Sequence, residues 1–286
     1  MYNLHYYHYT SLDSALCIFS TKKIRFTNVN DSDDEQEKLH NKKKNLINEL
    51  KKFYYDIYSG KYDNKEFMLN RYDNIKFIDA LKILIDNSYV LESINFDLYQ
   101  FCVTSKSNSL YHWENYSHNG KGVCIEFDYE SIFKDIINNA TSFKYSFMDY
   151  NQLYDGATIR KEIYCFLSGI IGNGIDVKGD IKEIYKQILY KFCVFRKRNK
   201  YRIEKETKLI YVIDKESKID DECSINYYFK DGKRINYLEI TFDKLFDYTN
   251  SVIIGYNCCR GEELFKNLFP ELNVYKSKIK VSIIKR

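Results

Sequence analysis

Two glutamates one residue apart, Glu204 and Glu206, stand in the stretch YRIEKETKLI, at the point where apolar residues begin to alternate. Alternate side chains of a strand point to the same face, so this spacing predicts that the two carboxylates lie together. A carboxylate pair can bind hydroxyl groups or carry out acid–base chemistry. An exposed strand edge that bears charges is the simpler interpretation, and the pattern alone leaves both open.

A histidine near the N-terminus is the second candidate for chemistry. His8 stands near the end of the aromatic stretch NLHYYHY and is followed by Tyr9 and Thr10, where the chain should turn into a helix. Either Thr10 or Ser11 can cap that helix. At the end of its strand His8 can meet a ligand, although a histidine in such a strand is more often satisfied within the core.

An aromatic block is the third candidate. Residues 108–122, NSLYHWENYSHNGKG, contain Trp113, which is the only tryptophan, and Tyr116. Gly120 and Gly122 allow a tight turn directly after these aromatic residues. The block is either a stacking platform for a flat ring or a small core that anchors the turn, and the sequence favours neither.

Several common kinds of site are absent from the sequence. The acidic stretch NVNDSDDEQE lacks the ligand spacing of a calcium loop, which favours an ordinary capping loop. The 8 cysteines form no Cys-x-x-Cys pair, which argues against a zinc site or a disulfide framework and favours reduced thiols. We therefore expect no metal. No phosphate-binding loop, dinucleotide fingerprint, hydrolase serine elbow or zinc-protease motif occurs.

The apolar pattern predicts the elements that position these residues. A single α+β domain over 1–286 is expected, with strands at both ends and in the middle and mainly helical insertions at 38–97 and 151–198. Asp231-Gly232 predicts a hairpin turn. The predicted strands are 3–9, 22–29, 98–105, 123–129, 206–213, the two arms of the hairpin within 225–242, 252–257 and 278–285; shorter helices are expected after residue 10, at 108–118, from about 130 and from about 261.

Charge and hydropathy indicate the setting. The net charge is +4, from 44 basic and 40 acidic side chains, which is too balanced to indicate nucleic-acid binding. The lysine run 42–44 is interpreted as the solvated face of a helix. There is no basic-then-apolar N-terminal run and no apolar stretch of the roughly 18 residues that a membrane span needs. We therefore expect a cytoplasmic protein with no membrane association.

These stretches occur in an order that resembles the bacterial family called domain of unknown function 2971. The resemblance runs from about residue 4 to 270, and its most specific part is Trp113 and Tyr116 followed by Gly-Val-x-Ile-x-Phe at 122–127. The chain departs from the family at residues 30–35, where Ser32 stands in place of a proline. It departs again at Lys208, which stands in place of an arginine.

That family is similar in pattern to ADP-ribosyltransferases, and the resemblance implies their fold, an α+β split β-sheet, here with two helical insertions. It implies that NAD is bound as a substrate in the cleft. His8, with Tyr9 and Thr10, would contact ribose or adenosine hydroxyls. Trp113 or Tyr116 would wall the nicotinamide pocket. Glu206 would be the catalytic carboxylate, with Glu204 as its neighbour.

The activity implied is cleavage of the nicotinamide–ribose bond, with transfer of ADP-ribose to a protein, a nucleic acid or water. By analogy of fold, the role would be that of a toxin or an anti-phage effector, and a homo-oligomer is among the expected states. Two alternatives stay open. One is a nucleotide or nucleic-acid binding module that uses the basic stretch FRKRNKYR at 195–202. The other is an interaction protein with a degenerate cleft.

Overall fold

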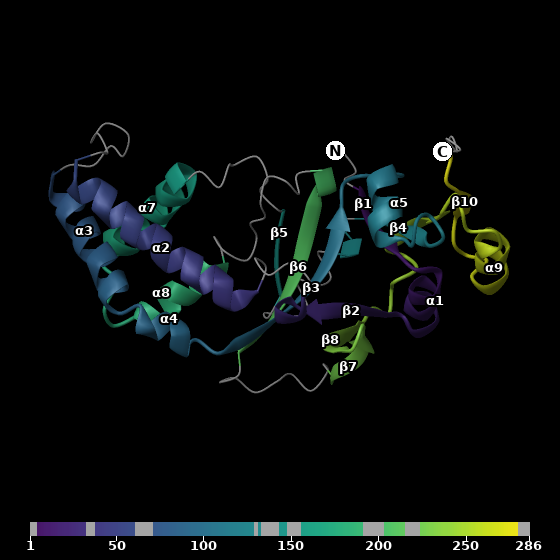
Figure 1. Ribbon diagram of the computed structural model, residues 1–286, viewed down its shortest axis with the longest axis horizontal. Helices are drawn as coiled ribbons and strands as arrows, with labels where there is room; N and C mark the ends of the chain where they lie inside the picture. The colour runs from purple at the N-terminus through teal and green to yellow at the C-terminus, as the bar shows by residue number, and fades with distance from the viewer. Residues whose placement is uncertain are drawn as a thin grey trace.

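The computed structural model describes residues 5–32, 38–60, 71–128, 131–132, 143–147, 156–190, 203–214 and 224–279. Its architecture is α+β. A mostly antiparallel sheet occupies the centre of Figure 1, and a lobe of helices lies at one end of it. The helices of that lobe come from two separate parts of the chain.

Ten strands form the sheet in the described part of the chain. They are β1 (His5–Thr10), β2 (Lys23–Asn28), β3 (Phe96–Thr104), β4 (Val123–Asp128), β5 (Phe143–Phe147), β6 (Glu206–Asp214), β7 (Ser224–Lys230), β8 (Lys233–Thr241), β9 (Thr249–Ile254) and β10 (Val274–Lys276). The main order is β10-β9-β4-β1-β3-β2-β8-β7, while β6 pairs with β3 and β5 with β6. The pair β9–β10 is parallel and the other pairs are antiparallel.

The sheet branches at β3. One edge of β3 pairs with β6 along its whole length, from Phe96 to Thr104. Because that edge is occupied, β1 and β2 must share the other edge. β1 meets it at Thr104, and β2 meets it at residues 99–100. The sheet is therefore split into two arms near residues 101–103 of β3.

A core on one face of the sheet is covered by α1 (Leu12–Thr21) and α9 (Gly261–Leu268). The helix α1 begins after Ser11, whose side chain accepts a hydrogen bond from the backbone N–H of Ser14. Of the two caps that the sequence allowed, Ser11 is thus the one used. Phe19 of α1 and Phe101 of β3 belong to this core, so α1 is fixed against the split.

The helical lobe is built from α2 (Leu39–Tyr58), α3 (Arg71–Asp86), α4 (Tyr89–Ser93), α7 (Gly156–Gly172) and α8 (Ile181–Ile188). Both predicted insertions are mainly helical where they are described, and their helices share one core. That core extends to Leu98 of β3 and Ile210 of β6. A buried ion pair between Arg160 Nη1 and Asp56 Oδ2, 2.6 Å apart, joins α7 to α2.

The prediction that lysines 42–44 form a solvated face is wrong for two of them. Lys42 and Lys43 are 5% and 7% exposed. The ammonium of Lys43 donates to the backbone carbonyl of Ile94 at 2.9 Å, and burial lowers the pKa of this lysine. Lys43 is therefore part of the attachment of α2 to the segment that enters β3.

Other predicted elements have mixed outcomes. The hairpin β7–β8 is confirmed, with Asp231 and Gly232 at φ values of 51° and 75°. The strand β5 was not predicted. The strand β10 at Val274–Lys276 was not predicted, and nearly all of the predicted strand 278–285 lies outside the described part, which ends at residue 279. Residues 33–37 of the acidic loop and the whole basic stretch 195–202 also lie outside it.

Candidate functional site

An open pocket lies at the split of the sheet, with about 400 Å³ of empty space including its mouth. It brings together residues from β1, β3, α5 (Leu110–Tyr116) and the start of β6. Its lining residues are Tyr7, His8, Tyr9, Cys102, Val103, Thr104, His112, Tyr116, Glu204 and Glu206. Five of the residues singled out in the sequence therefore meet here, although they are far apart in the chain.

His8 is held by the backbone of β3. Its Nδ1 lies 2.9 Å from the carbonyl oxygen of Cys102, which can only accept, so Nδ1 carries the proton. Its ring also packs against Phe101 at 4.5 Å between centroids. Burial lowers the pKa of His8 to about 4, against the smaller opposing effect of the bond to Cys102. The ring is neutral at pH 7, so its Nε2 is a hydrogen-bond acceptor.

Glu204 is buried and fixed by hydroxyl groups of α5. Tyr116 and Tyr111 both donate to its Oε1, at 2.7 and 3.3 Å. Its own backbone carbonyl accepts from the hydroxyl of Thr104 and from Nε2 of His112. Glu204 therefore ties α5 to the entrance of β6.

Glu206 is the first residue of β6. It pairs with Thr104, which in turn pairs with Tyr7, so the three side chains lie on the same face of the sheet. The ammonium of Lys208 lies 4.0 Å from Glu206 Oε2, and the lysine side chain is 3% exposed. The residue that replaces the family's arginine is thus a buried neighbour of this carboxylate.

The predicted closeness of the two glutamates has a different origin from strand periodicity. Glu204 precedes β6 in a short 3-10 turn, and Lys205 between the glutamates has a φ of 44°. The left-handed conformation of Lys205 changes the direction of the backbone between the two glutamates. Both carboxylates reach the pocket because of that turn.

His112 also lines the pocket, although the sequence did not single it out. Its ring stacks on Tyr9 at 5.0 Å, and its Nε2 donates to the Glu204 carbonyl at 3.0 Å. Burial lowers the pKa of His112, so the ring is neutral. The hydroxyl of Tyr9 donates to the carbonyl of Lys106 and accepts from the N–H of Ser109, which fixes the loop ahead of α5.

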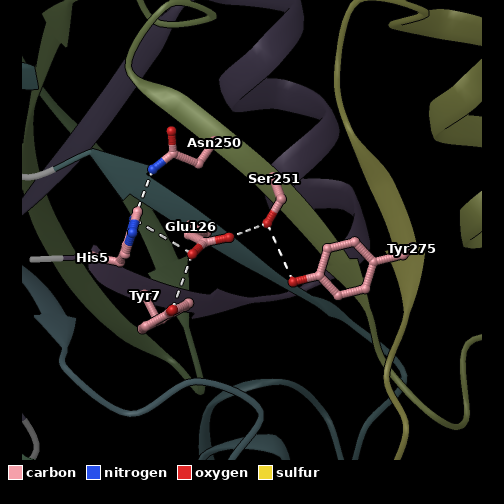
Figure 2. Close-up of polar contacts among 6 residues, drawn as sticks. All are labelled: His5, Tyr7, Glu126, Asn250, Ser251 and Tyr275. Atoms are coloured by element: carbon pink, nitrogen blue, oxygen red, sulfur yellow. Dashed lines mark hydrogen bonds and ion pairs between the residues drawn. The ribbon is translucent and has the colours of Figure 1, made fainter. Parts of the chain in front are cut away.

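A polar network extends from the pocket across β1, β4, β9 and β10 (Figure 2). The hydroxyl of Tyr7 donates to Glu126 Oε1 at 3.0 Å, and Ser251 donates to Oε2. The network consists of His5, Tyr7, Glu126, Asn250, Ser251 and Tyr275. Burial, and then the Glu126 carboxylate, raise the pKa of Tyr7, which keeps its phenol protonated and able to donate to Glu126. Tyr7 was not singled out from the sequence, and its alternation with Tyr9 along β1 is the signal that could have identified it.

Trp113 and Thr10 do not line the pocket. The indole of Trp113 is fully buried, lies edge-on to Tyr9 and donates from Nε1 to Asn108 Oδ1 at 3.0 Å. Thr10 pairs with Val123 of β4. Trp113 therefore belongs to a small core beside the site, and of the two aromatic candidates Tyr116 is the one at the pocket.

The turn after α5 fits closely against the end of β1. Gly120 has a φ of 77°, and a Cβ atom on Gly122 would lie 2.1 Å from the carbonyl oxygen of Thr10. The N–H of Gly255 donates to the Gly122 carbonyl at 2.9 Å. The turn thus locks α5, which carries His112 and Tyr116, onto β1.

In the part of the chain that the structure describes, no group of three or more His, Cys, Asp or Glu side chains could hold a metal ion. Among the helices of the same part, none is long and apolar enough to cross a membrane.

Comparison with known proteins gives one family. Residues 112–209 match the model of the family described as "Protein of unknown function (DUF2971)", which confirms the expected family resemblance over that stretch. The matched stretch includes α5 from His112 onward, β4 and both pocket glutamates. Ribonuclease E from Buchnera aphidicola subsp. Schizaphis graminum (strain Sg) is 29% identical over 184 residues. That alignment covers 59% of this chain and 17% of ribonuclease E. No solved structure gives a significant match.

Proposed function

We propose that this protein, which matches the DUF2971 family over residues 112–209, is an NAD-using enzyme with an ADP-ribosyltransferase-like split sheet. It would cleave the nicotinamide–ribose bond and pass ADP-ribose to a macromolecule or to water. The observation that carries the proposal is the pocket at the split of the sheet, where His8, Tyr116 and Glu206 meet.

His8 supports the recognition of a sugar. Its Nδ1 donates to the carbonyl of Cys102, and the neutral ring leaves Nε2 as the acceptor atom of this pocket-lining residue. A ribose hydroxyl is a donor of the right kind for that nitrogen. The same bond to Cys102 fixes the ring orientation before any ligand arrives, which lowers the entropic cost of binding.

Glu206 supports the chemistry. Loss of nicotinamide builds positive charge on the sugar, in an oxocarbenium-like transition state of the kind met in glycoside cleavage. A fixed carboxylate that holds the ribose 2′-hydroxyl stabilises this charge as it develops, which lowers the barrier rather than only improving binding. In the proposal Glu206 has this role, on the rigid strand β6 and opposite Thr104.

Glu204 has a supporting role in the proposal. Its Oε1 accepts from Tyr116 at 2.7 Å, which fixes the tyrosine ring at the pocket. A fixed aromatic ring is a suitable wall for the flat nicotinamide. The second carboxylate also adds negative potential near the acceptor.

The charge of the lining fits the cationic end of NAD. Two glutamates line the pocket, and among the lining residues that the structure describes there is no lysine or arginine. Carboxylates attract the positively charged pyridinium of NAD and repel phosphate. The nicotinamide–ribose end would therefore occupy the pocket, and the phosphates would lie outside it.

The alternative is a nucleotide-binding module without turnover, and the observation that favours it is Lys208. Its ammonium lies 4.0 Å from Glu206 Oε2 and offsets part of the charge that catalysis would need. A pocket whose acid is neutralised can still bind hydroxyl groups.

The test is nicotinamide release from NAD by the purified protein, with and without cell lysate as acceptor. We expect release by the wild type, and release that depends on lysate would indicate a transferase and bear on an effector role. For His8→Ala we expect a KM for NAD about fivefold higher, because one hydrogen bond is worth roughly 1 kcal/mol. His40→Ala, at an exposed position of α2, is the matched control and should leave KM unchanged.

The other outcomes decide against catalysis. If neither condition releases nicotinamide, but NAD raises the melting temperature of the wild type and not of His8→Ala, the binding module replaces the enzyme. If NAD has no effect on either protein, the pocket is not a NAD site.

A pH dependence of stability follows from the pKa of His8, which burial lowers to about 4 from 6.5 in the unfolded chain. Between these values the unfolded state binds more protons than the folded state, so stability should fall as pH decreases from about 6.5 to 4. Urea unfolding at pH 7 and pH 4.5 measures the loss. His8→Gln, which does not titrate, should lose less stability over the same interval; an equal loss would show that His8 is not responsible.

A further inference from the structure

A row of polar side chains crosses the sheet and ends at the pocket. The strand registers place Ser251 opposite Glu126 and Glu126 opposite Tyr7. They also place Tyr7 opposite Thr104 and Thr104 opposite Glu206. Residues that pair directly across strands share a face, so the five side chains lie on the face that carries the pocket. The network in Figure 2 is the part of this row beyond the pocket, and Tyr7 belongs to both.

Glu126 holds the hydroxyl proton of Tyr7. The phenol donates to Glu126 Oε1 at 3.0 Å, and Ser251 on the next strand donates to Oε2. The Glu126 side chain is 16% exposed, and His5 Nδ1 lies 3.5 Å from its Oε1. Because a hydroxyl group has one proton, Tyr7 can offer a ligand in the pocket only the lone pairs of its oxygen.

The other side-chain donors of the lining are also used within the protein. Each of the following donates to a carbonyl or carboxylate oxygen of the chain: His8, Tyr9, Thr104, His112 and Tyr116. Burial lowers the pKa of both histidines, so each neutral ring has a single proton to donate. The two glutamates accept only, and a thiol such as that of Cys102 is a weak donor. Among the lining residues that the structure describes, the side chains therefore offer a ligand acceptors and no strong donor.

We propose that this pocket selects groups that bring their own N–H or O–H donors, and that Glu126 is the positioning residue that sets this preference by holding the proton of Tyr7. The inference rests on the pocket of the proposed function but not on the cleavage of NAD. A ligand carbonyl or carboxylate placed here would lose its hydrogen bonds to water and meet lone pairs in their place. An amide N–H or a ribose hydroxyl satisfies the same acceptors.

Two pyridines isolate the preference in the wild type. Nicotinamide and 3-acetylpyridine are both uncharged and have nearly the same shape, but the first has an NH₂ group where the second has a methyl group. A site whose polar groups are left unpaired by an analogue discriminates against that analogue. We expect nicotinamide to bind about tenfold more tightly. Ligand-observed NMR titration of the purified full chain at pH 7 measures both dissociation constants, which for molecules of this size should be millimolar.

Variants of Glu126 test its part in the preference. Glu126→Met removes the acceptor of the Tyr7 hydroxyl and keeps a side chain of similar length, so the freed proton gives the pocket one donor. This variant should bind 3-acetylpyridine about fivefold to tenfold more tightly than the wild type does. Glu126→Gln keeps an acceptor oxygen for Tyr7 and should keep the wild-type preference. Adding Tyr7→Phe to Glu126→Met removes the donor again and should abolish the gain, which a merely structural role of Glu126 would not produce.

The outcomes separate this inference from the proposed function. Equal binding of the two pyridines by the wild type, or no gain of 3-acetylpyridine binding in a folded Glu126→Met variant, would overturn the inference; Glu126→Leu replaces that variant if it does not fold. If nicotinamide is preferred but NAD is not cleaved, the preference stands and the proposed cleavage is wrong. If neither pyridine binds, the pocket is not a nicotinamide site and both proposals are wrong.

Discussion

Replacing Glu206 by glutamine is expected to lower kcat for nicotinamide release by about 10²–10³-fold, while the protein remains folded. The amide has nearly the shape of the carboxylate but no charge, so it cannot stabilise the positive sugar of the transition state. Removal of one preorganised electrostatic group typically costs about 3–4 kcal/mol of barrier. Steady-state kinetics with NAD measure the effect, and KM should change much less than kcat.

Two controls separate this effect from a loss of structure. Glu262→Gln alters a partly exposed glutamate on α9, paired with Lys266 at 2.8 Å, and should keep full activity. Glu206→Gln also removes a carboxylate that lies 4.0 Å from the buried ammonium of Lys208. Loss of an ionic partner of a buried charge is destabilising, so we expect a lower free energy of unfolding for this variant. The double variant with Lys208→Met should recover stability but not activity. A Glu206→Gln enzyme with wild-type kcat would assign the catalytic carboxylate elsewhere.

Replacing Gly122 by alanine is expected to destabilise the protein by more than about 3 kcal/mol. The added methyl group would lie 2.1 Å from the carbonyl oxygen of Thr10 and 2.6 Å from the hydroxyl of Ser117. The first of these neighbours is backbone and cannot move aside without displacing the end of β1. Forced overpacking of this kind costs about 1–3 kcal/mol in cores that can adjust, and more where they cannot.

Chemical denaturation of the full chain measures this loss. Gly169→Ala on α7 is the matched control, since nothing lies within 4 Å of its added Cβ. Alanine is the better helix former by about 1 kcal/mol, so that variant should be as stable as the wild type or more so. Equal stability of the Gly122 and Gly169 variants would mean that the turn is not packed as described.

The site residues could be found from the sequence, but their arrangement could not. His8, Glu204 and Glu206 were recognised by residue type, position and resemblance. Their meeting depends on β1 and β6 pairing with opposite edges of β3, which no local pattern encodes. The left-handed conformation of Lys205, which brings Glu204 to the pocket, also could not be predicted from the sequence, because lysine has no preference for positive φ.

The sequence also failed to predict which of its polar and aromatic side chains are buried. Lys43 has the periodicity of a solvated lysine, yet its ammonium is held by a carbonyl 51 residues away in the chain. Trp113 stands in an aromatic block that is typical of a stacking platform, yet its indole packs in a small core beside Tyr9. In both cases a contact distant in sequence overrides the local pattern.

The branching of the sheet at β3 also has a consequence for biosynthesis. His8 is translated about 200 residues before Glu206, and β3 cannot complete the pocket until β6 has emerged to occupy its other edge. At about 5–20 residues per second this interval is roughly 10–40 s on the ribosome. A nascent chain released before β6 would lack both pocket glutamates, so the candidate site is incomplete until the last of its lining residues has been translated.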